Sequence, residues 1–207
     1  EFRRVLFRSG QPRSIRLVDD VMAGEDRLIG LVASKNPELD TPEPEDLYSV
    51  GTVAIVHRLF RAPDGSIRLL VQGLARFRLG EFVLQDPYLK ASVEMFPEMM
   101  EDDVEVEALA RNARDQFEHI AEMIPSIPRE LVASVVGLED PLQTIYTIAN
   151  FQRMDLNDAQ ELLELDPVLA KLRKLITILT HEVEMLEIGQ DRKSTRLNSS
   201  HMSESRM

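Results

Sequence analysis

The spacing of hydrophobic positions changes once along the chain. Before Pro97, short apolar runs alternate with turn signals. Residues 49–61 are rich in Val, Ile and Phe, residues 62–66 read Ala-Pro-Asp-Gly-Ser, and residues 67–72 return as a second apolar run. This pattern predicts a β-hairpin, because Pro fixes one turn dihedral and Gly accepts a positive φ. After Pro97, apolar residues recur every three or four positions, as in helices. The sequence therefore predicts an α+β fold, with the strands first.

Other segments of the first part have the same short-element character. Residues 14–23 carry an apolar face at helical spacing and predict a short helix. Residues 36–46 hold three prolines among five acidic residues, which predicts a solvated loop. The remaining apolar runs predict further short strands, with Gly80 separating two of them: residues 28–33, 76–79, 81–84 and 88–96.

The second part predicts four or five helices with recognisable starts. The first begins near Asp103, and Pro125 and Pro128 separate it from a second helix that stops at Gly137. Each later helix start is preceded by a capping residue, and the expected ranges are 140–151, 158–165 (Asn157 with Gln160 as a capping box) and a long helix after Asp166-Pro167. In the long helix, spacings of three and four form a heptad seam: Leu169, Leu172, Ile176, Leu179, Val183 and Leu186. It predicts a coiled-coil-like continuation.

The two ends of the chain read as translated adapter sequence. One possible coding of residues 191–199 has a reverse complement that encodes residues 1–8 and the start of Ser9. The two tails are thus readable as opposite strands of one DNA segment, so we expect a natural domain truncated at both ends. The predicted division is residues 1–9 adapter-like, 10–97 β-rich with its first strands missing, 98–190 a helical bundle with the start of the long helix, and 191–207 adapter-like.

Composition excludes several kinds of chemistry. The formal charge is −12, and each tail contributes +2, which leaves −16 for residues 10–190. Such acidity argues against nucleic-acid binding, although five arginines of the β-rich part include Arg76 and Arg78. The chain has no Cys, no Gly-Lys-Ser/Thr phosphate loop and no His at metal-ligand spacing. We therefore expect no active site, metal site or cofactor in this chain.

One cluster of side chains suits adaptable binding to apolar partners. Met95, Phe96, Met99 and Met100 lie where the β-rich part meets the helical part. Methionine is flexible and polarisable, which favours contact with varied apolar surfaces. Packing between the two parts is the alternative role. We take these four residues as candidate substrate-binding residues.

Several spaced motifs resemble the N-terminal domain of the Lon ATP-dependent protease family. They are Val-Gly-Thr-Val-Ala-Ile at 50–55, Asp-Gly at 64–65, Leu-Val-Gln-Gly-Leu-Ala-Arg-Phe at 70–77, Pro-Tyr-Leu-Lys-Ala at 87–91, and the stretch from residue 162 to 189. The resemblance covers residues 10–190. It implies a PUA-like β pseudo-barrel followed by a helical bundle.

The same resemblance implies a function in protein quality control: recognition of unfolded or degron-bearing proteins for a homo-hexameric protease. The lack of Cys, of a signal peptide and of a membrane-spanning apolar run favours a reducing cytoplasm and no membrane partner, and the acidity argues against a nucleic-acid partner. In that family the ATPase module, which uses ATP and Mg, and a Ser–Lys dyad lie further along the chain. Two alternatives stay open: a stand-alone binding protein of the same domain type without protease activity, and an RNA-binding module of PUA-like fold.

Overall fold

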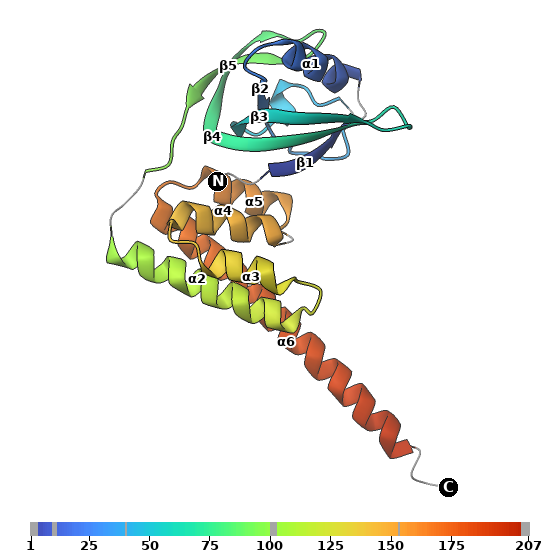
Figure 1. Ribbon diagram of the computed structural model, residues 1–207, viewed down its shortest axis with the longest axis vertical. Coiled ribbons are helices and arrows are strands. Elements are labelled where there is room, and N and C mark those ends of the chain that lie inside the picture. The colour runs from blue at the N-terminus through green and yellow to red at the C-terminus, as the bar shows by residue number, and fades with distance from the viewer. Residues whose placement is uncertain (1–3, 10–11, 40, 100–102, 153, 204–207) are drawn as a thin grey trace. The chain divides into compact units, whose positions relative to one another are not determined.

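The chain folds as two compact units that meet between Glu98 and Met99. The computed structural model describes residues 4–9, 12–39, 41–99, 103–152 and 154–203, and side chains within the range 12–189. The first unit is a β-sheet with one α-helix packed on it, and the second unit is helical. This confirms the predicted α+β class (Figure 1).

The first unit contains a five-stranded antiparallel sheet. Its strands are β1 (Arg4–Ser9), β2 (Leu28–Leu31), β3 (Val50–Arg61), β4 (Ile67–Leu84) and β5 (Lys90–Met95). The order is β1-β4-β3-β2, and β5 pairs with the second half of β4. Within the described ranges, β2 pairs only with β3 and β5 only with β4, so the sheet is not closed. β1 lies in the segment that the sequence assigns to an adapter.

Strand β4 corrects the sequence analysis, which expected three separate strands. It runs without interruption from Ile67 to Leu84, and Gly73 and Gly80 lie inside it. A Cβ at Gly80 would come within 2.5 Å of Ser92 Oγ on β5. The glycine therefore allows a close approach between two strands and does not mark a turn. The predicted hairpin turn is confirmed, with Gly65 at φ +80°.

Helix α1 (Pro12–Ala23) packs on one face of the sheet. Val18 on α1 and Ile29 on β2 are buried together with the inward side chains of β3 and β4. The alternation of buried and exposed positions along β3 and β4 fits one covered face and one exposed face. The predicted acidic loop contains one short 3₁₀ turn, Pro44–Asp46.

The second unit is a bundle of five helices. They are α2 (Val104–Met123), α3 (Arg129–Val136), α4 (Pro141–Phe151), α5 (Leu156–Glu164) and α6 (Val168–Ser203). Asp103 and Asp140 cap α2 and α4 through their side-chain oxygens, as the sequence predicts. The cap of α5 was misassigned, because Asp155 Oδ1 accepts the N–H of Asp158 at 2.8 Å. At α6, Pro167 directly precedes the first helical residue, and Asp166 Oδ1 accepts the N–H of Met99 at 3.1 Å.

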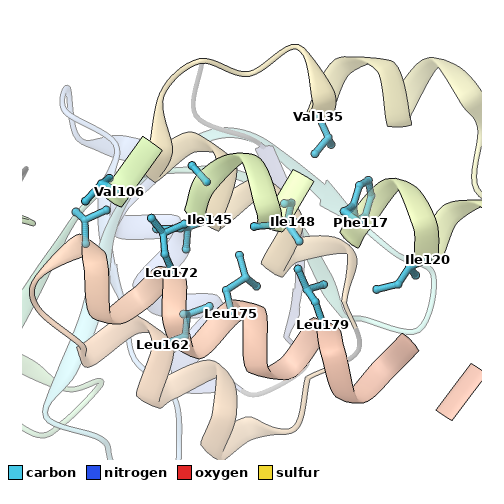
Figure 2. Close-up of a cluster of buried hydrophobic side chains, with 13 residues drawn as sticks. Val106, Phe117, Ile120, Val135, Ile145, Ile148, Leu162, Leu172, Leu175 and Leu179 are labelled. Carbon is cyan, nitrogen blue, oxygen red and sulfur yellow. The ribbon is translucent and has the colours of Figure 1, made fainter. Parts of the chain in front are cut away.

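The bundle core forms where α2, α4 and α6 meet. Figure 2 shows Leu172, Leu175 and Leu179 on α6 among Phe117 of α2 and Ile148 of α4, all fully buried. The first half of the predicted heptad seam thus packs inside this unit. Within the part of the chain that the structure describes, no helix is long and apolar enough to cross a membrane.

Two lysines on α6 hold α5 in place. The Lys171 ammonium is fully buried and donates to the carbonyl oxygens of Leu162 and Leu163, at 2.6 and 2.9 Å. These carbonyls belong to the last turn of α5, where intrahelical donors run out. Lys174 donates to Asp158 and Glu161 at 2.7 and 2.6 Å, and these contacts raise its pKa.

Candidate functional site

A groove of about 540 Å³ opens in the first unit. It lies where α1, the free side of β2, and the β4–β5 hairpin approach one another, and apolar side chains make up most of its lining. Its lining includes Arg13, Leu17, Val21, Leu28, Gly30, Phe77, Leu79, Val83, Tyr88, Lys90 and Val93. Among the described strands, none closes the sheet between β2 and β5, so no strand covers the groove on this side.

Phe77 forms the floor of the groove. Its side chain is 1% exposed and points at the backbone of two glycines. A Cβ at Gly30 would lie 3.2 Å from Phe77 Cζ, and one at Gly51 would lie 2.8 Å away. Glycine at these two positions lets the tip of the ring approach the backbone of β2 and β3 closely.

Tyr88 fixes one wall of the groove. It is 6% exposed, and its hydroxyl donates to Asp20 Oδ2 of α1 at 2.5 Å. The hydrogen bond to the Asp20 carboxylate, with burial, raises the pKa of Tyr88. The bond ties the segment between β4 and β5 to α1, so the two walls keep a defined separation.

The upper walls expose large apolar side chains to solvent. Val83 is 71% exposed, Val93 is 49% exposed and Leu28 is 45% exposed. Single exposed apolar residues are common on protein surfaces, but here they line the same depression. Such an arrangement suits a ligand that brings apolar groups of its own.

The charge of the groove is opposite to that of the chain. Of the described residues that line it, Arg13 and Lys90 carry positive charge, and none is Asp or Glu. The chain as a whole carries −12. The groove therefore favours an apolar ligand with some negative charge.

The structure separates the four candidate residues named from the sequence. Met95 is 53% exposed and lies opposite Phe77 on β5, so both side chains lie on the groove face of the sheet. Phe96 lies on the other face, with the guanidinium groups of Arg76 and Arg78 at 3.8 and 3.7 Å from its ring centre.

The other two candidates belong to the second unit. Met99 is 64% exposed, and Met100 lies outside the described residues. Two of the five arginines of the β-rich part are paired with carboxylates, so they do not add to an open basic face. Arg76 is 2% exposed and pairs with Glu98 at 3.3 Å, while Arg61 pairs with Asp19 at 2.5 Å.

The sequence analysis missed the groove residues of α1, of the last turn-proximal part of β4 and, apart from Met95, of β5. A usable signal was the apolar run Phe82-Val83-Leu84, because a half-buried strand should alternate there. The other contributors come from segments far apart in the sequence, and no local pattern joins them.

Comparison with known proteins settles the family. The model of the ATP-dependent protease La (LON) substrate-binding domain matches residues 6–181. The chain belongs to the Lon substrate-binding domain family. It is 41% identical over 180 residues to a Lon protease of Dictyoglomus thermophilum and 40% identical over 190 residues to Lon protease 1 of Herpetosiphon aurantiacus.

These matches cover most of this chain but a small share of the relatives. They span 87% and 89% of this chain, and 22% and 23% of the two Lon proteases. The matched part of Lon is the substrate-binding domain and not the catalytic part. The predicted family resemblance is therefore confirmed, together with the prediction that this chain is not the catalytic part of Lon.

Solved structures show the same fold. The N-terminal domain of the Lon protease from Mycobacterium avium complex superposes with a TM-score of 0.68 at 21% identity, covering 86% of this chain and 91% of that one. A Lon N-terminal domain protein from Xanthomonas campestris gives a TM-score of 0.57 at 18% identity, covering 84% and 89%. At these identities the likeness concerns the fold alone.

Proposed function

We propose that this Lon substrate-binding domain captures unfolded or degron-bearing proteins through the groove of its first unit. The observation that carries the proposal is the open, apolar face between β2 and β5, with Phe77 as its floor and exposed Val83 and Val93 on its walls. An unfolded chain exposes the apolar side chains that such a depression accepts.

The four sequence-derived residues remain part of this proposal. Met95 extends the groove face, and Met99 adds a second exposed methionine beyond it in the sequence. For Phe96 and Met100, a role in substrate binding stays a prediction. Methionine suits varied partners because its side chain adapts its shape.

The wider setting is also proposed from the family. The rest of a homo-hexameric, cytoplasmic Lon protease supplies the ATPase with its ATP and Mg, and the proteolytic site, while this domain needs no cofactor. The open sheet corresponds to a PUA-like pseudo-barrel, and the part of α6 before residue 191 is the start of a long coiled-coil-like helix. Neither nucleic acid nor a membrane is a partner of this domain. We also propose that the two tails, residues 1–9 and 191–207, are adapter-like. The natural domain then divides into the subdomains 10–97 and 98–190.

A pair of matched variants tests the groove. Val93→Asp places a carboxylate on its wall, whereas Val104→Asp changes an 82% exposed valine at the start of α2 in the other unit. Fluorescence anisotropy with labelled, reduced and carboxymethylated α-lactalbumin measures binding to a permanently unfolded protein. Loss of one valine contact predicts about a tenfold weaker Kd for Val93→Asp and no change for Val104→Asp.

Thermal unfolding of both variants serves as the control, since both positions are exposed and the melting temperatures should stay within about a degree of the parent. Equal binding by all three proteins, or equal loss in both variants, would contradict the proposal.

A further inference from the structure

Among the strands that the structure describes, β5 pairs only with β4, so the backbone groups on its other side have no strand partner there. In an antiparallel pair, residues opposite each other alternate between hydrogen-bonded and non-hydrogen-bonded pairs. The N–H of Phe96 donates to the carbonyl of Arg76 at 3.0 Å, so this pair is of the hydrogen-bonded kind. The next pair toward the hairpin, Met95 opposite Phe77, is then of the other kind.

A second contact supports the same alternation of hydrogen-bonded and non-hydrogen-bonded pairs, two residues further along β4. The N–H of Leu79 donates to the carbonyl of Ser49 at 2.7 Å and therefore points away from β5. Leu79 lies opposite Val93, so Val93 is not hydrogen-bonded to it. It follows that the N–H and C=O groups of Val93 and Met95 point to the free side of the strand.

Side chains of the same two residues lie on the groove face. Val93 lines the groove, and Met95 lies opposite Phe77, which forms its floor. Both side chains are about half exposed, at 49% and 53%. An extended segment beside β5 would therefore meet backbone donors and acceptors at its edge, and apolar side chains on one face.

Charge selects among extended segments. Arg13 and Lys90 face the groove with no carboxylate among the described lining residues. The Lys90 ammonium lies 5.2 Å from the centre of the Tyr88 ring, at the end of β5 nearest the hairpin turn. An acidic side chain on the segment would lie beside two cations over a partly apolar surface, where attraction is stronger than in water.

We propose that the domain binds its substrates as an added β-strand on the free side of β5, and that it prefers apolar segments bearing an acidic side chain. The inference rests on the proposed function, because it assigns the conformation and charge of what the groove takes. A second copy of the chain fits less well, because the one acidic side chain of β5, Glu94, alternates with Val93 and Met95 and so lies on the face of the sheet away from the groove.

Peptides with altered backbones test the strand pairing directly. The probe is a fluorescein-labelled peptide of about ten residues, the upper end of usual strand lengths, with alternating Val and Ser and one Glu in a Val position. Two versions carry N-methyl groups on alternate residues, one on the even and one on the odd positions. In a paired strand only one set of N–H groups faces β5, so one version should lose about tenfold or more in affinity and the other should bind like the parent.

The charge preference has its own comparison. Changing the peptide Glu to Gln should weaken binding several-fold to the parent protein, and much less to Lys90→Gln with Arg13→Gln. Sedimentation velocity of the full chain at the same concentrations tests pairing between copies. A dimer that persists at high peptide concentration and does not bind the peptide would assign the edge to self-association and overturn the proposal.

The two proposals fail in different ways. If the unfolded lactalbumin binds through the groove but both methylated peptides bind equally, substrate capture stands and strand addition is overturned. If Val93→Asp leaves lactalbumin binding intact, the groove assignment falls and strand addition falls with it. An unchanged affinity for the Gln peptide would remove the acidic preference.

Discussion

Gly51 is the position where a single methyl group should do the most damage to the groove. It lies on β3 opposite Phe77. A Cβ there would meet the carbonyl oxygen of Leu31 at 2.5 Å, Val32 Cγ2 at 2.7 Å and Phe77 Cζ at 2.8 Å. All three distances are shorter than real carbon contacts, and the first is to the backbone of β2, which cannot move without loosening its pairing with β3.

The magnitude follows from two opposing effects. Overpacking a well-filled site costs about 1–3 kcal/mol, and a backbone obstacle puts Gly51→Ala at the upper end. Replacing glycine in a strand returns about 0.5–1 kcal/mol through the lower entropy of the unfolded chain. The net expectation is a loss of about 2 kcal/mol in the first unit, which is roughly a thirtyfold rise in its unfolded fraction.

Hydrogen exchange followed by mass spectrometry is the suitable assay, because it reports each unit separately. Peptides from β2, β3 and β4 should exchange about thirtyfold faster in Gly51→Ala, while peptides from α2 and α6 stay at the parent rate. Gly65→Ala is the matched control, since no atom lies within 4 Å of its Cβ and only its positive φ is strained. Parent-like exchange in β2 and β3 of Gly51→Ala would refute the packing described for the groove floor.

Other substitutions test the contacts that hold each unit together. Lys171→Met removes the buried donor to the last turn of α5 and should cost about 2 kcal/mol of unfolding free energy, measured by urea denaturation; a loss under about 0.5 kcal/mol would contradict the capping role. Lys174→Met should cost less than about 1 kcal/mol at neutral pH. Because Asp158 and Glu161 raise the pKa of Lys174, its contribution to the free energy of unfolding is fully present below the ordinary pKa of 10.5 and is lost as the pH rises through the raised pKa. The difference in stability between Lys174→Met and the parent should therefore shrink above that pH. A difference that grows there would contradict the ion pair. Tyr88→Phe removes the hydroxyl bound to Asp20 and should lower stability and speed exchange in α1, and unchanged α1 protection would show that the bond does not fix that wall.

Local signals in the sequence located most of the elements. The Pro-Asp-Gly turn predicts the β3–β4 hairpin, and Asp103 and Asp140 cap their helices as expected. The predicted break at Gly80 is wrong, because a glycine that lets Ser92 approach cannot be told in sequence from one that makes a turn. The α5 cap was displaced by two residues because Asp155 and Asn157 are both good capping residues, and only the packed helix decides between them.

The groove itself could not be predicted from local patterns. Its lining comes from α1, β2, β4 and β5, and its openness depends on β2 and β5 each lacking a second partner among the described strands. The four candidate residues from the sequence located the groove only in part. Met95 lies on the groove face, whereas Phe96 is held between two arginines by contacts that depend on the register of β4 and β5.

Site-specific photo-crosslinking tests most directly whether substrates enter the groove. A benzophenone side chain replaces Val83, which is 71% exposed on the groove wall, or Val104, which is 82% exposed in the second unit. Each full-length protein is irradiated with carboxymethylated α-lactalbumin, and the adducts are mapped by mass spectrometry. The account predicts abundant adducts from position 83, suppressed by excess unlabelled unfolded protein, and few from position 104. Equal yields from both positions, or a higher yield from position 104, would contradict it.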